Sequence, residues 1–378
     1  MMNLSYWERT SFFKNYDYTI IGAGIVGLFA AIEIKTKKPN AKVLVLERSA
    51  IPDGASTKNA GFACFGSLSE IIEHRNRTSE KTFLDLVDKR YKGIQKLKNF
   101  LGPENIDFIS SGAYEVFKND ENEIYQSCIK KMQEYNRLLE DIIGVNVYET
   151  ADDAIEKFGL KNVEHLIYSK YEAQIHSGKM MQSLIELAFS KGVNILFNAD
   201  VLALIKRDSE IILQTNITEI TTSACIVCNN VFAKKLIPSL DIQPGRGQVL
   251  ITNRIDNLKL KGNFHYDKGY YYFRNIDNRV LIGGGRNLDF KGEETFEFGT
   301  SETIQNHLIG ILHDVILPYI DFEIEQSWSG IMGFGSELNP IVEELDENIY
   351  CAVRCNGMGV ALGPMIAEEV AELAIKNS

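Results

Sequence analysis

The sequence predicts an α/β protein whose parallel-sheet domain is interleaved with a second, β-rich domain. Three observations indicate this organisation. A strand, a glycine-rich turn, a helix and a second strand follow one another between residues 18 and 47. A helix and three strands alternate again between residues 178 and 214, whereas residues 246–286 read as strands alone. Because no low-complexity linker separates these stretches, we expect the two domains to be interleaved and not serial.

The first strand leads into a turn of the pattern G-x-G-x-x-G, formed by Gly22, Gly24 and Gly27. Gly22 permits the tight turn, Gly24 lets the backbone approach a pyrophosphate, and Gly27 lets the following helix pack closely on the strand. The N-terminus of that helix supplies free N–H groups and a positive dipole end for phosphates. The turn therefore predicts a Rossmann-like dinucleotide site that includes Ile25 and Val26.

The second strand, residues 42–46, ends in Glu47, about twenty residues after Gly27. An acid at this distance accepts hydrogen bonds from the ribose hydroxyls, and it favours FAD or NAD over NADP. A glycine-rich turn that merely packs a helix on a strand is the alternative, and such a turn would not need Glu47.

The properties of the whole chain narrow the classes of function. Its 378 residues suit two domains or one large one, and its apolar (45%) and charged (24%) fractions are those of an ordinary soluble globular protein. A net charge of −11 argues against a nucleic-acid partner. The N-terminal segment lacks the pattern of a signal peptide, and no stretch reaches the length of a membrane span. We therefore expect a cytoplasmic protein.

No metal site is predicted. The six cysteines are scattered, which suits reduced thiols, and the histidines show no ligand spacing. Cys225 and Cys228 have the spacing of a redox or zinc pair, but they lie in an apolar stretch that reads as a buried strand. Residues three apart on a strand point to opposite faces, so the two sulfurs would diverge.

Patterns outside the nucleotide unit predict the second domain. Residues 80–101 and 124–142 repeat apolar side chains at helical spacing. Between them, residues 108–117 suggest a hairpin.

The strand predicted at residues 270–274 places Tyr270, Tyr272 and Arg274 on one face. An aromatic face that carries an arginine is suited to line a binding site for an anionic or planar ligand. A half-exposed sheet face is the alternative interpretation.

A second glycine-rich loop lies near the C-terminus, between a strand at 348–353 and a helix that ends at about residue 376. The loop, Asn356 to Gly359, opens the N-terminus of this helix, which is again suited to negative charge. It could face a ring that becomes anionic when it is reduced.

Together these stretches resemble the D-amino-acid oxidase-like (DAO) superfamily of FAD-dependent oxidoreductases, which includes glycine oxidase, sarcosine oxidase and amine-oxidising relatives. The resemblance spans about residues 17–375. It rests on the first glycine-rich turn with Glu47 and Arg48, on residues 54–61, which look like the family's flavin loop, and on the C-terminal loop with Pro364. Other matching stretches are residues 245–248, 270–274, 282–284 and 328–330.

The resemblance implies a Rossmann-like FAD-binding domain interrupted by a substrate domain that is built on a large antiparallel sheet. We assign residues 1–80, 150–230 and 325–378 to the FAD-binding domain. Residues 81–149 and 231–324 form the substrate domain.

The resemblance also implies the contacts to FAD. Glu47 would bind the adenosine ribose with Arg48 beside it, and the backbone of Val201 would contact the adenine. The flavin loop would contact the pyrophosphate and the isoalloxazine, and the C-terminal loop would cover the pyrimidine edge. The residues of these two loops, with the glycine of the Trp-x-Gly stretch, are Ser56, Thr57, Lys58, Asn59, Gly61, Gly330, Asn356, Gly357, Met358 and Gly359.

Three departures from the family pattern concern the substrate and the electron acceptor. Amino-acid-oxidising members carry a carboxylate-binding arginine where this chain has Met332, which cannot form a bidentate pair, so either the substrate lacks a carboxylate or Arg354 or Arg274 holds it. Residues 279–283 lack the lysine that speeds the reaction of sarcosine-oxidase-like members with oxygen. Residues 333–336 lack the cysteine that links flavin covalently, which favours non-covalent FAD. The alternative attachment points are Cys64 and Cys355.

The implied reaction is hydride transfer from a carbon next to nitrogen, in a small amine or amino acid, to flavin N5, with O₂ as acceptor. Tyr270 matches a family tyrosine that bonds the substrate, and we group it with Arg354 and Met332 as candidate catalytic residues. A flavin-dependent 2-hydroxy-acid or polyol dehydrogenase that passes electrons to a quinone or carrier is the alternative. An FAD-binding subunit of a larger complex is a further one.

Overall fold

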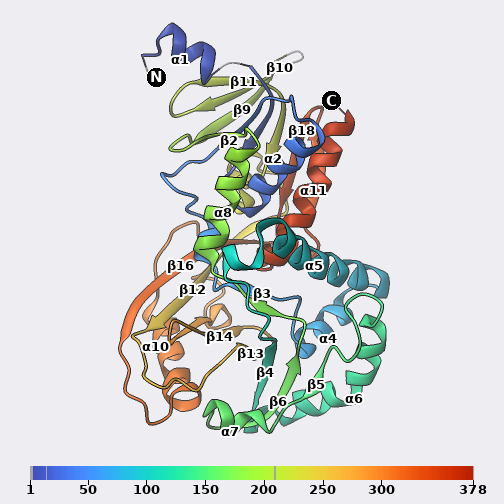
Figure 1. Ribbon diagram of the computed structural model, residues 1–378, viewed down its shortest axis with the longest axis vertical. Coiled ribbons are helices and arrows are strands. Elements are labelled where there is room, and N and C mark those ends of the chain that lie inside the picture. The colour runs from blue at the N-terminus through green and yellow to red at the C-terminus, as the bar shows by residue number, and fades with distance from the viewer. Residues whose placement is uncertain (1–2, 14, 208–209, 378) are drawn as a thin grey trace.

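The computed structural model describes residues 3–13, 15–207 and 210–377. Two sheets of eight strands each dominate it, one in the part that carries both termini and one in the opposite part (Figure 1). The mixed α/β architecture agrees with the predicted fold class.

Five parallel strands form the centre of the first sheet. In spatial order they are β18 (Ile349–Val353), β11 (Glu219–Val227), β1 (Tyr16–Ile21), β2 (Val43–Leu46) and β8 (Asn194–Leu196). The antiparallel strand β17 (Ile341–Asp346) lies beside β18, and β10 (Glu210–Thr215) and β9 (Val201–Arg207) continue antiparallel from β11.

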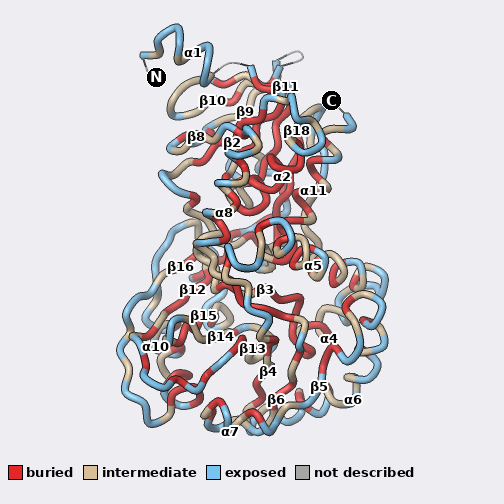
Figure 2. The backbone as a smooth tube through the Cα atoms, in the orientation of Figure 1, coloured by how far each residue is buried: buried red, intermediate tan, exposed pale blue. Residues whose placement is uncertain are grey.

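Both faces of this sheet are covered, which explains why its central strands are almost continuously apolar (Figure 2). Ile20 and Val45 pack in one cluster with the helices α2 (Ile25–Lys37) and α11 (Gly359–Asn377). Leu44 packs on the other face with β9 and β10. The helix α8 (Ser177–Ser190) joins the first of these two faces.

Cys225 and Cys228 belong to these two different clusters, as their spacing on a strand predicts. All six cysteines are free and buried.

The second sheet is antiparallel except for one parallel pair. Its order is β16 (Ile324–Phe334), β12 (Gln243–Thr252), β15 (Arg279–Gly284), β14 (Tyr271–Ile276), β13 (Asn263–Tyr266), β4 (Ala113–Lys118), β6 (Val163–Ser169) and β5 (Glu149–Thr150), with β13 and β4 parallel. The helices around it are α4 (Leu68–Arg77), α5 (Glu80–Leu101), α6 (Asn122–Leu139), α7 (Ala154–Phe158) and α10 (Glu302–Ile311). A two-stranded sheet of β3 (Phe62–Ala63) and β7 (Ala173–Gln174) lies at the junction.

Three details differ from the sequence prediction. The hairpin expected at residues 108–117 is one strand, β4, preceded by an isolated bridge between Ile109 and Gln174. The strands β6 and β16 pair within the second sheet, although the ranges 150–230 and 325–378 had placed them in the FAD-binding domain. The order of elements in the sequence does not reveal that β6 and β16 pair with strands of the second sheet. The division as a whole stays a prediction.

Among the described residues, no helix is long and apolar enough to cross a membrane.

Candidate active site

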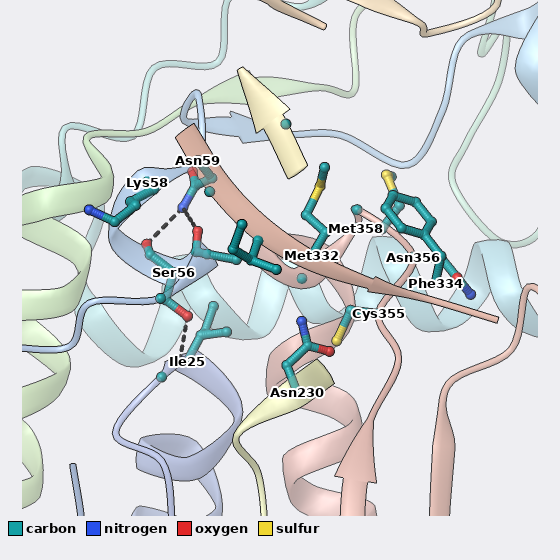
Figure 3. A pocket seen from close by; sticks show the side chains of 18 of the residues that line it. Ile25, Ser56, Lys58, Asn59, Asn230, Met332, Phe334, Cys355, Asn356 and Met358 are labelled. Carbon is teal, nitrogen blue, oxygen red and sulfur yellow. Dashed lines mark hydrogen bonds between the residues drawn. The ribbon is translucent and has the colours of Figure 1, made fainter. Parts of the chain in front are cut away.

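A cavity of about 800 Å³ receives residues from both sheets (Figure 3). This volume is typical of a pocket for a small molecule or cofactor. One end is lined by the glycine-rich turn and by Glu47, Arg48 and Val201, which are distant from one another in sequence. The other end is lined by residues that follow β18 and by side chains of the second sheet.

The glycine-rich turn has the geometry that its sequence predicts. Gly22 has a φ of 104°, a region that favours glycine. A Cβ at Gly27 would overlap the carbonyl oxygen of Gly22, so the close approach of helix to turn requires glycine there. Gly22, Gly24, Ile25 and Val26 line the cavity, whereas Gly27 lies behind it as the packing residue.

Glu47 is 7% exposed and lies at the end of β2. One of its carboxylate oxygens accepts the Ala23 N–H at 3.1 Å and the other accepts the Ser49 N–H at 3.1 Å. Burial raises the pKa of Glu47, although these two hydrogen bonds oppose the rise. The carboxylate thus ties the glycine-rich turn to the end of the second strand, and it keeps lone pairs for a ligand hydroxyl.

Arg48 lies beside Glu47 with its guanidinium carbon 3.8 Å from the centre of the Phe232 ring. Val201, at the start of β9, lines the cavity near these residues. This end therefore has an apolar wall, an acid and a cation.

The predicted flavin loop contains a short helix, α3 (Ala55–Lys58). Its Ser56 hydroxyl accepts the Ile25 N–H at 3.0 Å, so the loop is joined to the start of α2 (Figure 3). The Asn59 amide donates to the Ser56 carbonyl at 2.7 Å and its oxygen accepts the Gly61 N–H at 2.9 Å. Ser56 can still donate its own O–H to a phosphate, whereas the Asn59 side chain mainly orders the loop.

Lys58 lines the cavity and forms an ion pair with Asp53 at 2.7 Å. Thr57 and Gly61 do not line it. The Thr57 hydroxyl donates to the carbonyl oxygen of Pro52 at 2.7 Å, which holds the loop together. Thr57 and Gly61 therefore support the loop and do not face the cavity, although both were predicted as FAD contacts.

Arg274 extends from the second sheet to the back of the same loop. Its guanidinium donates to the carbonyl oxygens of Gly61 at 2.6 Å, Ile175 at 2.8 Å and Ala60 at 3.2 Å. These three bonds all use Nη1, and Arg274 is absent from the cavity lining, so the arrangement does not support Arg274 as the carboxylate-binding cation considered from the sequence.

The C-terminal loop has two residues in the left-handed region, Asn356 (φ 48°) and Gly357 (φ 82°). The Asn356 amide donates to the carbonyl oxygens of Glu337 and Leu338 at 3.0 and 2.9 Å. All four residues from Asn356 to Gly359 line the cavity, and α11 begins at Gly359. The positive end of this helix therefore faces the cavity.

Arg354 is buried beside this loop but does not line the cavity. Its guanidinium pairs with the Asp241 carboxylate at 2.7 Å and donates to the carbonyl oxygen of Asn339 at 3.0 Å. These partners commit the Arg354 guanidinium away from the cavity, and its expected contact with the substrate stays a prediction.

Tyr270, Tyr272 and Met332 line the second end of the cavity, together with Gly330 and Phe334. Figure 3 shows Met332 and Phe334 beside Asn356 and Met358. Tyr270 lies just before β14 and is 39% exposed. The Tyr272 ring packs edge-on against Phe62 at 5.6 Å, and burial raises its pKa to about 12.

A carboxyl group lies close to Tyr270. A Cβ built on the neighbouring Gly269 would lie 3.3 Å from a carboxylate oxygen of Glu70, and Glu70 also lines the cavity. Burial raises the pKa of Glu70, although the charges of Arg90 and His265 oppose the rise.

His265 lines the cavity and pairs with Glu172 at 3.1 Å. Burial alone would lower the pKa of His265, but the Glu172 hydrogen bond and the charges of Glu172, Glu70 and Glu115 together raise it. The sulfur of Cys64 lies within 4.8 Å of the ligand atoms of this pair, a grouping that the sequence spacing did not indicate. Glu172 already accepts the N–H groups of Phe65 and Gly66 at 3.0 Å, so its carboxylate holds the backbone as well as His265. The expectation of no metal stays a prediction.

The polar or charged lining residues to which sequence reasoning assigned no role include Glu70, His265, Tyr272 and Arg286. Tyr272 was placed on the correct face of its strand without a role. Arg286 directly follows Gly283-Gly284-Gly285 at a strand end, which is a signal for a ligand-facing residue. Glu70 and His265 gave no signal, because their proximity depends on the packing of α4 against the second sheet.

Comparison with known families identifies the family to which the chain belongs. The FAD-dependent oxidoreductase (DAO) family model matches residues 17–373, nearly the whole chain. The chain belongs to this family. It is therefore an FAD-dependent oxidoreductase, as the resemblance implied.

Individual DAO relatives are distant. A probable oxidoreductase OrdL of Haemophilus influenzae is 22% identical over 394 residues, which cover 95% of this chain and 83% of that protein. The L-2-hydroxyglutarate dehydrogenase of Escherichia coli K12 is 21% identical over 323 residues, which cover 78% of this chain and 72% of that protein. Among solved structures, glycine oxidase from Geobacillus kaustophilus has a TM-score of 0.78 at 19% identity, and the match covers 96% of this chain and 95% of that one. At this identity the structural likeness shows the shared fold.

The residues present fit FAD. The glycine-rich turn and α2 offer N–H groups for a pyrophosphate, and Glu47 offers a ribose acceptor. The second helix N-terminus, at Gly359, offers positive potential to a ring that becomes anionic. Three cysteines line the cavity, but burial raises the pKa of the Cys355 thiol to about 12 and those of Cys64 and Cys228 well above the ordinary value. Protonated thiols are poor nucleophiles, which supports non-covalent binding.

Proposed function

We propose that this FAD-dependent oxidoreductase oxidises a C–N bond of a small amine or amino acid, with hydride transfer to flavin N5 and O₂ as acceptor. The observation that carries the proposal is the carboxyl group of Glu70, which lines the same cavity as Tyr270 and lies near the backbone of Gly269, the residue before it. An ammonium group gains a counter-charge there, whereas a neutral hydroxyl gains much less. Glycine oxidase is among the proteins of similar fold.

In the proposed mechanism the chain positions the substrate and removes one proton. Bound FAD supplies the hydride acceptor. Glu70 accepts a proton from the substrate ammonium, because a free lone pair on nitrogen is needed to expel hydride from the adjacent carbon; burial, which raises the pKa of Glu70, makes its carboxylate a stronger base. The Tyr270 hydroxyl orients the substrate. The N-terminus of α11 would offer positive potential to negative charge on a bound flavin, and the imine product would then hydrolyse in water.

The test is anaerobic mixing of the yellow holoenzyme with a panel of primary and secondary amines, amino acids and 2-hydroxy acids. We expect bleaching of the flavin absorbance by members of the amine or amino-acid set. Bleaching by hydroxy acids alone would refute the proposal.

A 2-hydroxy-acid dehydrogenase is the second candidate, and the His265–Glu172 pair favours it. Removal of a hydroxyl proton requires a base, and His265 lines the cavity. Burial would lower the pKa of His265, but Glu172 and the neighbouring acids raise it, so such an enzyme would gain rate as the pH rises through this pKa. L-2-hydroxyglutarate dehydrogenases of Salmonella houtenae and Escherichia coli are among the relatives.

The acceptor is tested separately, because β15 carries no lysine. Substrate-reduced enzyme is exposed to air-saturated buffer and to a quinone. Rapid return of the yellow colour with release of H₂O₂ is expected for an oxidase. Reoxidation by the quinone alone would identify a dehydrogenase.

A further inference from the structure

A cysteine, a glutamate and a histidine meet at the wall of the cavity. The sulfur of Cys64, a carboxylate oxygen of Glu172 and a ring nitrogen of His265 all lie within 4.8 Å of one another. They come from three separate segments, since Cys64 directly follows β3, Glu172 directly precedes β7 and His265 lies on β13. His265 pairs with Tyr272 across β13 and β14, so the cluster lies at the end of the cavity that Tyr272 lines.

The three donor types are those that bind zinc. Thiolate sulfur, imidazole nitrogen and carboxylate oxygen bind Zn²⁺ at about 2.3, 2.0 and 2.1 Å, so the ligand atoms of a tetrahedral site are about 3.4–3.6 Å apart. Nε2 of His265 and an oxygen of Glu172 are 3.1 Å apart. The sulfur of Cys64 has to approach them by about 1.3 Å at most to complete three ligand positions.

Glu172 is held in an orientation that suits a metal ligand. Its Oε1 accepts the N–H groups of Phe65 and Gly66, both at 3.0 Å, whereas its Oε2 is the atom that contacts His265. Because Cys64 directly precedes Phe65, the same backbone contacts keep the thiol near the carboxylate. Hydrogen bonds of this kind to a ligating carboxylate orient the ligands in known metal sites.

The surroundings of the cluster favour a cation. Glu70 and Glu115 interact electrostatically with His265, as does Glu172 itself. The guanidinium of Arg90 opposes these acids. In this group of described residues three carboxyl groups face one guanidinium, and a divalent ion reduces the imbalance.

An ion can reach the cluster from the cavity. Cys64 and His265 both line it, although they are only 8% and 5% exposed, whereas Glu172 lies behind them and is 1% exposed. The side of the cluster that faces the cavity is therefore open to solvent or to a further ligand.

We propose that Cys64, Glu172 and His265 bind one Zn²⁺ ion from the cavity and that this ion inhibits the enzyme. Zinc displaces the thiol proton of Cys64 to solvent and separates the His265–Glu172 hydrogen bond, so that the two atoms bind the metal instead of each other. The metal-free protein keeps the His265–Glu172 pair described above. Zinc is therefore an exchangeable ligand of the enzyme and not a cofactor of its reaction.

The inhibitory effect rests on the proposed function. Glu70, which the mechanism assigns to the substrate ammonium, lines the cavity and interacts electrostatically with His265 and Glu172. A divalent ion held by the cluster attracts the Glu70 carboxylate and repels the ammonium group.

The first test measures zinc binding to the oxidised holoenzyme without substrate. The protein is treated with a chelator, desalted and titrated with ZnCl₂ by calorimetry in two buffers of different ionisation enthalpy. We expect one ion per chain and a release of protons. C64S and H265Q should each raise the Kd for zinc by about 100-fold or more, because each removes one of three protein ligands.

Cys225→Ser and His165→Gln are the matched controls. Cys225 is buried on β11, and His165 pairs with Asp152 at 2.8 Å; neither is among the residues that line the cavity. Both variants should bind zinc like the wild type. Equal loss in a variant and its control would overturn the inference, as would a wild-type protein that binds no zinc.

X-ray absorption at the zinc edge keeps the test decisive if C64S or H265Q fails to fold or to retain FAD. The wild-type complex should show one sulfur ligand at about 2.3 Å beside nitrogen and oxygen ligands at about 2.0–2.2 Å. A spectrum with nitrogen and oxygen ligands alone would overturn the inference.

Inhibition is measured with the substrate that the anaerobic panel identifies. At a low concentration of this substrate, zinc at ten times its Kd should slow flavin reduction by about tenfold, as competition for one site requires. Excess EDTA should restore the rate, and the same zinc concentration should leave the rate of C64S unchanged. Zinc that binds at the cluster without slowing reduction would overturn the inhibition.

Failure of this inference is distinguishable from failure of the proposed function. Calorimetry and X-ray absorption require no turnover, so they decide the zinc site even if no amine bleaches the flavin. Conversely, bleaching by amines together with a wild-type protein that binds no zinc would refute the site and leave C–N oxidation standing.

Discussion

At the scale of single residues, the chemistry of the site depends on groups whose charge is set by burial and by neighbours. Glu70 and His265 both have raised pKa values, for different reasons: burial dominates for Glu70, whereas the acids around His265 outweigh its burial. Arg354, the cation singled out by sequence, is committed to Asp241. Arg286 instead has a buried donor without a protein partner among the described residues.

Glu70→Gln should slow anaerobic reduction of the flavin by an amine or amino acid. At neutral pH we expect the rate constant to fall by about 10²-fold, because loss of positioned proton transfer costs at least that much. The rate should recover as the pH approaches the pKa of the free amine, where bulk water has already removed the proton.

Glu73→Gln is the control for this experiment, since Glu73 also lines the cavity but faces Lys268 at 3.9 Å. The flavin of this variant should be reduced by the substrate at the wild-type rate. A pH-independent defect in Glu70→Gln would assign Glu70 a structural role only.

His265→Gln should flatten the pH dependence of stability. The folded pKa of His265 is raised, so its contribution is fully present below the unfolded value of about 6.5 and is lost as the pH rises through the folded pKa. Thermal unfolding of the FAD-saturated protein from pH 6 to 9 should therefore show a falling midpoint for the wild type. Glutamine can still donate to Glu172 but does not titrate, so its curve should fall less; parallel curves would contradict this assignment.

At the scale of elements, two helix N-termini and one loop line the cavity. The loop around α3 is joined to α2 by the hydroxyl of Ser56 and is held internally by Thr57. Both hydroxyl residues were predicted as FAD contacts. Their different partners explain why only Ser56 lines the cavity.

Ser56→Ala should weaken FAD binding by about fivefold, the equivalent of one ordinary hydrogen bond. Thr57→Val should leave FAD affinity within about twofold of the wild type and lower the thermal midpoint instead. Titration of apoprotein with FAD, followed by flavin fluorescence, separates the two. Equal weakening by both substitutions would show that Thr57 acts on FAD directly or through the whole loop.

At the scale of the whole molecule, the cavity exists because two sheets are held together at the flavin loop. Arg274 makes this connection: it originates on β14 and binds the backbone of residues 60, 61 and 175. Burial lowers its pKa to about 10, which still leaves it charged at neutral pH. The junction is therefore a polar contact in which one side chain donates hydrogen bonds to three carbonyl groups.

Arg274→Met should lower the free energy of unfolding by about 2–4 kcal/mol, because it leaves buried carbonyl groups without donors. FAD affinity should fall with it. Arg75→Met, which removes an arginine from the surface pair with Glu80, should change neither quantity measurably. Normal FAD affinity in Arg274→Met would show that the loop keeps its shape without this connection.

The sequence by itself determined the fold class, the glycine-rich turn and the cofactor family, because these depend on local requirements. Gly22 has a positive φ that favours glycine, and a Cβ at Gly27 would overlap the Gly22 carbonyl oxygen. The helix from Glu80 to Leu101 follows from periodicity alone. Tertiary structure decided which polar groups face the cavity. Arg354 pairs with Asp241 and does not line the cavity, whereas Arg286 lines it and lies against two phenylalanine rings. Long-range partners of this kind, like the pairing of β6 and β16 with the second sheet, have no signature in the local pattern of the chain.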